Sequence, residues 1–299
     1  MSRGILIFAH NNEGIDYVKI ACANALMIRK NMDVDGITLV TDDTSLNYSL
    51  TDHENIAKYF FDEIVVYENK KFTKRNYRDH TRSDKVLTFY NGDRSEAWDI
   101  TKYDETIIID ADYLIQDSIL NDCWSSEHSF MANKNITTIN TLFPMQQPRI
   151  NYQGIEQYWA TVVYFKKDDE AKMIFEAWKN VKNNHPYYKA LYDIPGKIFR
   201  NDFALSVALH ITENMNISSL PESYLLSSFD EDDIIDVGLN KIILSTRDND
   251  RQDFMPVKIE NRNVHVMNKF ALLEHIETIM ETYAEWVEDI LPLHKTAAT

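Results

Sequence analysis

The sequence of 299 residues contains only two cysteines, Cys22 and Cys123, which stand far apart among apolar or mixed neighbours. This number and spacing argue against a disulfide framework and a cysteine-ligated metal site, so we interpret both as reduced thiols. No apolar run reaches the roughly 18 residues that a membrane-spanning helix needs, and residues 1–4 lead directly into a predicted strand instead of a signal peptide. We therefore expect the protein to work in the cytoplasm, away from membranes.

Basic residues are scarce as well: 31 lysines and arginines stand against 47 aspartates and glutamates, giving a formal net charge of −16 and a pI of about 4.9. Such a surface opposes non-specific binding of nucleic acid or anionic membrane, although it allows a local basic site. The seven glycines form no glycine-rich phosphate loop near the first predicted strand. What the chain does contain is 44% hydrophobic and 12% aromatic residues, enough for the core of one large α/β domain or two small ones.

The segment 103–115 is the most informative stretch of the chain. Its centre contains Ile107, Ile108 and Ile109 in succession, which predicts a strand of a parallel sheet that is buried on both faces. The strand runs into Asp110-Ala111-Asp112, and ligands of open α/β sheets gather just beyond the carboxyl ends of the strands. Carboxylate oxygens suit Mg²⁺ or Mn²⁺, with substrate phosphates completing the coordination. An acidic turn without function is the alternative interpretation.

The remaining pattern predicts an α/β fold with a mostly parallel sheet flanked by helices. Strands, counted with the polar residues that end them, are expected over 4–12, 36–43, 61–67 and 158–165, and helices over 15–30, 118–124, 168–183, 199–210 and 272–291. Strand–helix–strand spacing of this kind implies parallel strands joined by right-handed crossovers.

A local concentration of positive charge interrupts this acidic chain between residues 70 and 85. It consists of Lys70, Lys71, Lys74, Arg75, Arg78, Arg82 and Lys85. A solvated loop is one interpretation. The other, which we favour because the rest of the chain is so negative, is a segment that contacts a polyanion, either a pyrophosphate or a nucleic-acid backbone.

Two further polar groups stand out in the second half of the chain. Asn201 or Asp202 could cap the helix expected over 199–210, or could serve a site at its positive end. Near the C-terminus, a short predicted strand delivers His265, and a turn presents Lys269 four residues later.

An apolar strand that runs into Asp-Ala-Asp, followed about 150 residues later by His265 and Lys269, resembles the pattern of GT-A-type, nucleotide-sugar-dependent glycosyltransferases, in particular the glycogenin-like ones. The resemblance covers roughly residues 4–272. It implies a single GT-A-like α/β domain with acceptor-side insertions, divided into a nucleotide-binding half (1–115) and an acceptor half (116–272). Residues 273–299 would form a C-terminal amphipathic helix and tail. The segment from His265 to Lys269 is one residue shorter than the family's His-x-x-Gly-x-Lys pattern and lacks its glycine.

The same resemblance implies roles for single residues. Asp110, Asp112 and His265 would bind Mn²⁺ or Mg²⁺, and Lys269, together with either Arg82 or Arg94, would contact the diphosphate of a nucleotide-sugar donor, with a UDP-sugar favoured. The base and ribose would lie against residues at the first two strand ends, namely Ala9, His10, Asn11 and Asp42. Asp202 would face the acceptor and act as general base if the reaction inverts the configuration. Retention needs no such base, and the sequence leaves this choice open.

Two runs, residues 99–115 and 199–210, also resemble glycosyltransferases of T-even-type tailed phages, in which sugar transfer to hydroxymethylated or hydroxylated cytosine in DNA is a known function. This implies an arabinosyl- or glucosyltransferase in the host cytoplasm, with DNA bound by the basic stretch, namely Lys70, Lys71, Lys74, Arg75 and Arg78.

Other functions stay open. The acceptor could be a protein, a glycan or a small molecule. The chain could also be a nucleotidyltransferase, which the missing glycine-rich loop disfavours, or a catalytically silent nucleotide-binding module. The C-terminal helix could pack on its own domain or join two subunits in a dimer, so the oligomeric state is open too.

Overall fold

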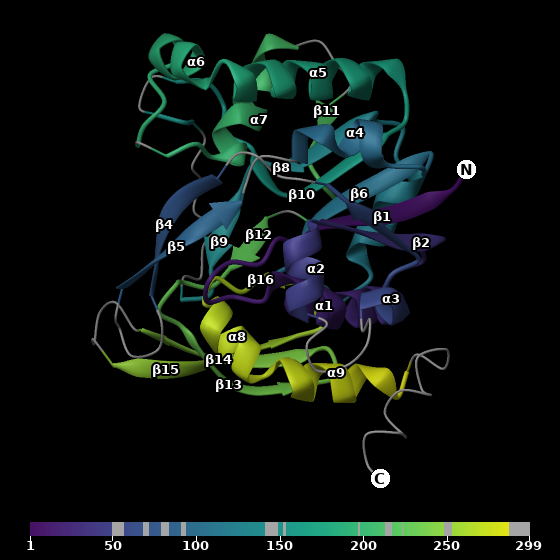
Figure 1. The fold of residues 1–299 in the computed structure, drawn as a ribbon, viewed down its shortest axis with the longest axis vertical. Coiled ribbons are helices and arrows are strands. Elements are labelled where there is room, and N and C mark those ends of the chain that lie inside the picture. Colours follow the sequence, from purple (N-terminus) through teal and green to yellow (C-terminus); the bar gives the residue numbers. More distant parts are fainter. Residues whose placement is uncertain are drawn as a thin grey trace.

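A computed structural model describes residues 1–49, 57–67, 72–78, 84–90, 94–140, 149–151, 154–196, 198–212, 217–222, 224–247 and 253–286. Within them, a seven-stranded sheet forms the centre of the molecule (Figure 1). In spatial order its strands are β11 (Ile217–Ser218), β8 (Phe130–Asn133), β10 (Trp159–Lys166), β6 (Glu105–Asp110), β1 (Arg3–Phe8), β2 (Gly36–Thr41) and β3 (Glu63–Val66). Only β10 runs antiparallel to its neighbours. The expectation of a mostly parallel α/β sheet is therefore confirmed.

Helices cover both faces of this sheet. They are α1 (Tyr17–Asn31), α2 (Asp43–Ser49), α3 (Ala57–Phe60), the 3₁₀ turn η1 (Arg94–Glu96), α4 (Ala97–Ile100), the 3₁₀ turn η2 (Ile119–Ser125), α5 (Asp169–Asn183), α6 (His185–Leu191), α7 (Asn201–Ile211), α8 (Lys269–Glu274) and α9 (Ile276–Ala284). Figure 1 shows α5 and α7 on one side of the sheet and α1 with α9 on the other.

The successive isoleucines of β6 supply both layers, because neighbouring side chains of a strand point to opposite faces. Ile107 and Ile109 pack in the core cluster that includes α1 and α9, whereas Ile108 packs in the cluster that includes α5 and α7. All three are fully buried. A polar residue at any of these three positions would be buried in one of the two core clusters. This explains why apolar and polar residues do not alternate along the isoleucine run of β6.

The two long helices begin at aspartates that cap them. The side chain of Asp16 accepts a hydrogen bond from the backbone N–H of Lys19 at the start of α1, and Asp168 accepts one from Ala171 at the start of α5 (2.9 Å each). A cap of this kind stabilises a helix by about 1 kcal/mol. The buried face of α5 has the 3.6-residue period that the sequence shows, with Trp178 fully enclosed at its centre.

Two glycines on adjacent strands make room for an aromatic ring beside the sheet. Gly4 and Gly36 lie opposite each other in the parallel β1–β2 register. A Cβ atom on Gly4 would lie 2.0 Å from a ring carbon of Tyr103, and one on Gly36 would lie 2.6 Å from the Tyr103 hydroxyl. The tyrosine that precedes β6 therefore packs across both strands.

The described residues also form three smaller sheets. The first contains β7 (Tyr113–Leu114), β16 (Val264–His265), β12 (Leu225–Ser227) and β9 (Ile136–Thr138), the second contains β13 (Asp233–Gly238), β14 (Lys241–Arg247) and β15 (Phe254–Glu260), and the third is the hairpin of β4 (Phe72–Arg78) and β5 (Asp84–Tyr90). The hairpin takes up part of the basic segment, which the sequence did not predict to be strand.

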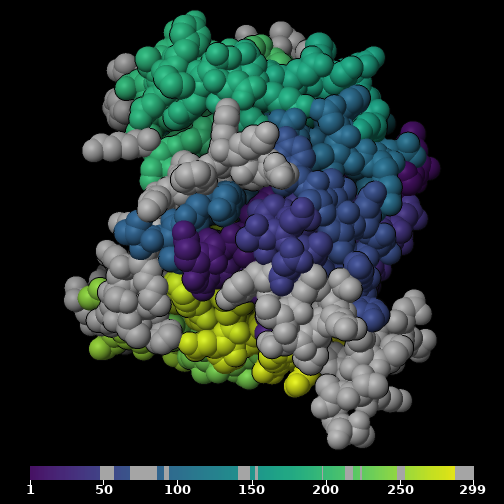
Figure 2. All heavy atoms as spheres, in the orientation of Figure 1, coloured from purple at the N-terminus to yellow at the C-terminus, as the bar shows by residue number. Residues whose placement is uncertain are grey.

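The C-terminal segment packs on the N-terminal half of the same chain. Of the helix expected over 272–291, residues 287–291 lie outside the described residues, and the described part contains two helices, α8 and α9, which are separated at His275. Lys19 of α1 forms an ion pair with Glu277 of α9 (2.5 Å), and Figure 2 shows the C-terminal helices (yellow) directly against the N-terminal segment (purple). Among the described residues, no helix has the length and apolar character that crossing a bilayer requires.

Candidate active site

A cleft of about 470 Å³ opens at the carboxyl ends of β1 and β6. These two parallel strands are neighbours, with Phe8 opposite Asp110, but the chain goes from β1 to β2 on one side and returns to β6 on the other. This is the topological switch point at which α/β sheets bind ligands. Both Phe8 and Asp110 line the cleft.

The first carboxylate of the Asp-Ala-Asp turn is buried and paired with an arginine. Arg94, in the 3₁₀ turn η1, forms an ion pair with Asp110 and also donates a hydrogen bond to the backbone carbonyl of Ala160 (3.3 Å). Burial raises the pKa of Asp110 to about 6, against the opposing effect of the Arg94 charge. Of the two arginines that the sequence offered, the structure brings Arg94 into the cleft, whereas Arg82 lies outside the described residues.

The second carboxylate is held by two groups from the end of the chain. His265 Nε2 lies 3.2 Å from one oxygen of Asp112, and Lys269 Nζ lies 2.6 Å from the other. Burial by itself would raise the pKa of Asp112, but the positive charges of Lys269 and His265 outweigh it and hold that pKa well below its usual range. The segment from His265 to Lys269 is one residue shorter than the His-x-x-Gly-x-Lys pattern, and it still brings both side chains to the carboxylate of Asp112.

Asp110, Asp112 and His265 together fit a divalent cation. One ligand atom of each lies within 4.8 Å of the other two, and the group is buried or nearly so. The two carboxylates are hard ligands and the imidazole is a borderline one. This combination suits Mn²⁺ and disfavours Ca²⁺, which prefers oxygen ligands alone. All three residues line the cleft, so a cation held by them would be accessible to a substrate oxygen.

Residues expected to contact a nucleotide fall into two groups. His10 lines the cleft, lies 6.0 Å from the ring of Tyr90, and has a buried Nε2 with no hydrogen-bond partner among the described residues. Burial lowers its pKa, so the ring is neutral at pH 7. Ala9, Asn11 and Asp42 do not line the cleft.

All three make structural contacts instead. The backbone N–H of Ala9 bonds to Val40 on the neighbouring strand. Asn11 donates to the cap residue of α1 and also accepts a hydrogen bond from the backbone N–H of Val18. Asp42 accepts a hydrogen bond from the backbone N–H of Ser45 at the start of α2 (2.7 Å). These contacts explain the polar residues at the two strand ends without a ligand.

Asp202 also lines the cleft. The cap position of α7 is Arg200, so Asn201 and Asp202 belong to the helix and neither caps it. Instead, the Asp202 carboxylate accepts a hydrogen bond from the backbone N–H of Ala160 (3.0 Å) and pairs with Arg200 (2.9 Å). Both contacts fix the position of this carboxylate in the cleft.

The aromatic wall around Asp202 was not predicted. Trp159, Phe199 and Phe229 line this side of the cleft, and the buried Nε1 of Trp159 has no hydrogen-bond partner within the described part of the chain. These rings come from a strand start and two loops, so no periodic pattern marks them. Their only signal in the sequence is proximity to elements that were already assigned, such as Phe199 next to the α7 segment.

The basic stretch is described only in part. Lys70 and Lys71 lie outside the described residues, and Lys74, Arg75 and Arg78 lie on β4. β4 pairs with β5, whose last two residues, Phe89 and Tyr90, line the cleft.

Comparisons with known proteins give a likeness of backbone only. No family model matches the chain, and neither does any curated protein. Among solved structures, the chain is similar to the galactosyltransferase LgtC in complex with donor and acceptor sugar analogues (11% identity, TM-score 0.42, 72% of each chain). It is also similar to mouse xyloside xylosyltransferase 1 (8%, 0.43, 74% of this chain and 85% of that one) and to a provisionally named glucose-1-phosphate thymidylyltransferase from Bacillus anthracis (9%, 0.37, 73% and 86%). At these identities and TM-scores the likeness decides nothing about activity, which has to rest on the site.

Proposed function

We propose that the protein is a metal-dependent glycosyltransferase of the GT-A type, which moves a sugar from a nucleoside-diphosphate sugar to an acceptor hydroxyl, with a UDP-sugar as favoured donor. One observation carries the proposal: two carboxylates, an imidazole and two cationic side chains converge in one cleft at the switch point of the sheet. A diphosphate bound together with a divalent cation needs this combination, because the carboxylates hold the cation while cationic groups contact the phosphate oxygens.

A divalent cation held by Asp110, Asp112 and His265 would neutralise the negative charge that develops on the leaving diphosphate. Lys269 and Arg94 add to this stabilisation, since each is fixed by a carboxylate and borders the cleft. In the transfer, the bond between the anomeric carbon and the diphosphate oxygen breaks, and its electron pair stays on the diphosphate. The acceptor oxygen forms the new bond to the anomeric carbon.

The proton of the acceptor hydroxyl has two routes. If the configuration inverts, the carboxylate of Asp202 accepts it, since this group borders the cleft together with the cation ligands. If the configuration is retained by attack on the same face, an oxygen of the leaving diphosphate accepts the proton. Replacing Asp202 by Asn distinguishes the two routes, because only the first loses turnover by the 10²–10⁴-fold that a general base contributes.

Modified cytosine in DNA is the acceptor that we favour. Two features support it: the resemblance to phage glycosyltransferases, and the position of Lys74, Arg75 and Arg78 on the strand next to the one whose end lines the cleft. A base that enters the cleft would meet the rings of Trp159 and Phe199, and bases stack on such side chains. A protein, glycan or small-molecule acceptor is the alternative.

The test is donor hydrolysis across a panel of nucleotide sugars, with Mn²⁺ or with a chelator, in the wild type, Asp112→Ala and Asp33→Ala. Asp33 is a surface aspartate whose side chain is 86% exposed, so it controls for the loss of one negative charge. We expect Mn²⁺-dependent release of one nucleoside diphosphate, lost in Asp112→Ala and kept in Asp33→Ala. Adding DNA that contains hydroxymethylcytosine then tests the acceptor.

Three results would contradict the proposal in different ways. Release of pyrophosphate from a nucleoside triphosphate would identify a nucleotidyltransferase. Binding of a nucleoside diphosphate without turnover of any donor would identify a silent binding module. Turnover that survives Asp112→Ala would remove the Asp-Ala-Asp turn from the active site.

A further inference from the structure

A buried hydrogen-bond network lies directly behind the three cation ligands. Its centre is Glu222, whose carboxylate accepts one hydrogen bond from the hydroxyl of Tyr113 and another from Nδ2 of Asn263 (2.7 Å). Asn263 in turn accepts hydrogen bonds from the backbone N–H groups of Gln116 (2.8 Å) and Asp117 (3.1 Å). Tyr113 is 0%, Asn263 1% and Glu222 7% exposed, so no part of the network can rely on water to replace a lost partner.

The network joins three segments that are far apart in the sequence and meet at the cation ligands. Tyr113 follows Asp112 directly, Asn263 precedes β16, and Glu222 precedes β12. β7 and β16 pair antiparallel with Tyr113 opposite His265, and β12 pairs with the other edge of β16 with Ser227 opposite His265. The separation between Asp112 and His265 therefore depends on how these three strands are held together.

The strands themselves are too short to fix that separation. β7 and β16 have two residues each and β12 has three, and a two-stranded ribbon of this length is at best marginally stable by itself. Beyond the ladder, the backbone N–H of Val266 bonds to the carbonyl of Asp112 (2.9 Å). The ring of Tyr113 also meets the ring of His265 edge-on, with centroids 6.4 Å apart. Side chains must supply the remaining rigidity.

We propose that Glu222, acting through Tyr113 and Asn263, is a positioning residue for the cation site: it fixes the three short strands so that Asp112 and His265 keep the geometry of a shared ligand set. The proposal rests on the proposed function only in so far as Asp110, Asp112 and His265 bind a divalent cation. Among the described residues, Glu222 is not part of the cleft lining, and its hydrogen bonds go to Tyr113 and Asn263, so it acts through the residues beside the cation ligands. Groups that orient metal ligands in this indirect way typically change metal affinity by 10–100-fold when they are lost.

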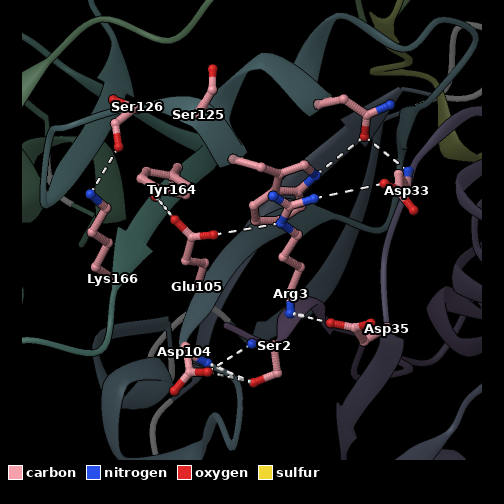
Figure 3. Close-up of polar contacts among 12 residues, drawn as sticks. Ser2, Arg3, Asp33, Asp35, Asp104, Glu105, Ser125, Ser126, Tyr164 and Lys166 are labelled. Atoms are coloured by element: carbon pink, nitrogen blue, oxygen red, sulfur yellow. Dashed lines mark hydrogen bonds and ion pairs between the residues drawn. The ribbon is translucent and has the colours of Figure 1, made fainter.

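The chain contains a matched control for this idea. Tyr164 on β10 donates a hydrogen bond to Glu105 (2.8 Å), so it forms a second buried tyrosine–glutamate pair, and Glu105 also faces Arg3 at 3.7 Å (Figure 3). Glu105 begins β6, and Asp110, which ends the same strand, is a cation ligand. Removing the Tyr164 hydroxyl therefore breaks the same kind of bond in the same core, but at the end of the strand away from the site.

The experiment measures Mn²⁺ binding to the full chain without any sugar donor, from the free Mn²⁺ signal in electron paramagnetic resonance. Unfolding by urea is followed on the same proteins. We expect Tyr113→Phe and Tyr164→Phe to lower the midpoint of urea unfolding by similar amounts, because each leaves one buried carboxylate oxygen without its donor. Tyr113→Phe should also weaken Mn²⁺ binding at least tenfold, whereas Tyr164→Phe should change it less than twofold.

Glu222→Gln is the second variant, in case Tyr113→Phe does not fold. It keeps the volume and one acceptor oxygen, so we expect a loss of Mn²⁺ affinity in the same direction and about threefold in size. Equal Mn²⁺ affinity in Tyr113→Phe, Glu222→Gln and Tyr164→Phe would overturn the positioning role while leaving the cation site intact. If the wild type binds no Mn²⁺, or binds it as well as Asp112→Ala does, the cation site itself is refuted and the positioning role with it.

Discussion

Lys269 gives a quantitative test of the electrostatics of the site. Its Nζ lies 2.6 Å from Asp112, and both side chains are at most 8% exposed. With an effective dielectric constant of about 20, Coulomb's law gives an attraction of about 6 kcal/mol at this distance, part of which is offset by the desolvation of the two groups. Lys269→Met keeps the length of the side chain but leaves Asp112 with His265 alone. We expect the free energy of unfolding at pH 7 to fall by about 3 kcal/mol.

The pH dependence of this loss separates electrostatics from packing. In the wild type, the pKa of Asp112 is held well below its usual range, so its contribution to stability is present above the unfolded-state pKa and is lost as the pH falls through the folded-state value. Without the lysine, the folded-state pKa rises. The difference between wild type and variant should therefore be largest near pH 7 and shrink between about pH 5 and pH 3.

The assay is urea unfolding with a chelator present at pH 7, 5 and 3.5. Lys19→Met serves as control, since Lys19 pairs with Glu277 on the surface, where such a pair contributes at most about 1 kcal/mol. The reasoning fails if Lys269→Met costs no more than Lys19→Met, or if its cost is the same at all three pH values.

Three further predictions concern the rest of the fold. Gly36→Ala should destabilise the protein, because the new Cβ would lie 2.6 Å from the Tyr103 hydroxyl. Adding Tyr103→Phe removes that hydroxyl and should restore part of the lost stability. A double-mutant cycle of urea unfolding would measure this coupling. Burial raises the pKa of Glu222 to about 7, so the wild type should lose stability as the pH rises through 7. Glu222→Gln should remove about 3 kcal/mol of this pH-dependent loss. Urea unfolding of both proteins at pH 4.5 and pH 8 would show the difference. Trp178→Ala should cost about 3–5 kcal/mol in thermal or urea unfolding, because the ring is fully buried and stacks on Phe175.

How far the sequence predicts this molecule depends on whether a feature is local. β6 and the Asp-Ala-Asp turn are visible in the sequence because a strand buried on both faces has an unmistakable composition. The helix α5 is visible because its buried positions recur every three or four residues. The break between α8 and α9 at His275 is not visible, since neither proline nor glycine marks it.

The site itself shows the same division. His265 and Lys269 could be associated with Asp112 only through a family resemblance, because nothing in their own surroundings points to residues about 150 positions away. The sequence offers Arg82 and Arg94 equally as arginines for the diphosphate, and only the structure shows that Arg94 contacts Asp110. Glu222 had no signal at all: it lies in a loop, and its two partners come from other segments. Asp42 and Asn11 are expected at a ligand from the sequence, and the structure shows that both also stabilise helix starts.

The late arrival of His265 and Lys269 in the chain has a consequence for biosynthesis. Strands β1, β2 and β6 can pair as soon as residues 1–110 have left the ribosome, and domains generally begin to fold from the N-terminal side. At that stage Asp110 and Asp112 are close together, but the segment that supplies the imidazole and the lysine has not been made. A nascent chain therefore carries two neighbouring carboxylates without their partners, and Mn²⁺ binding with full affinity would report that translation and folding of the whole domain are complete.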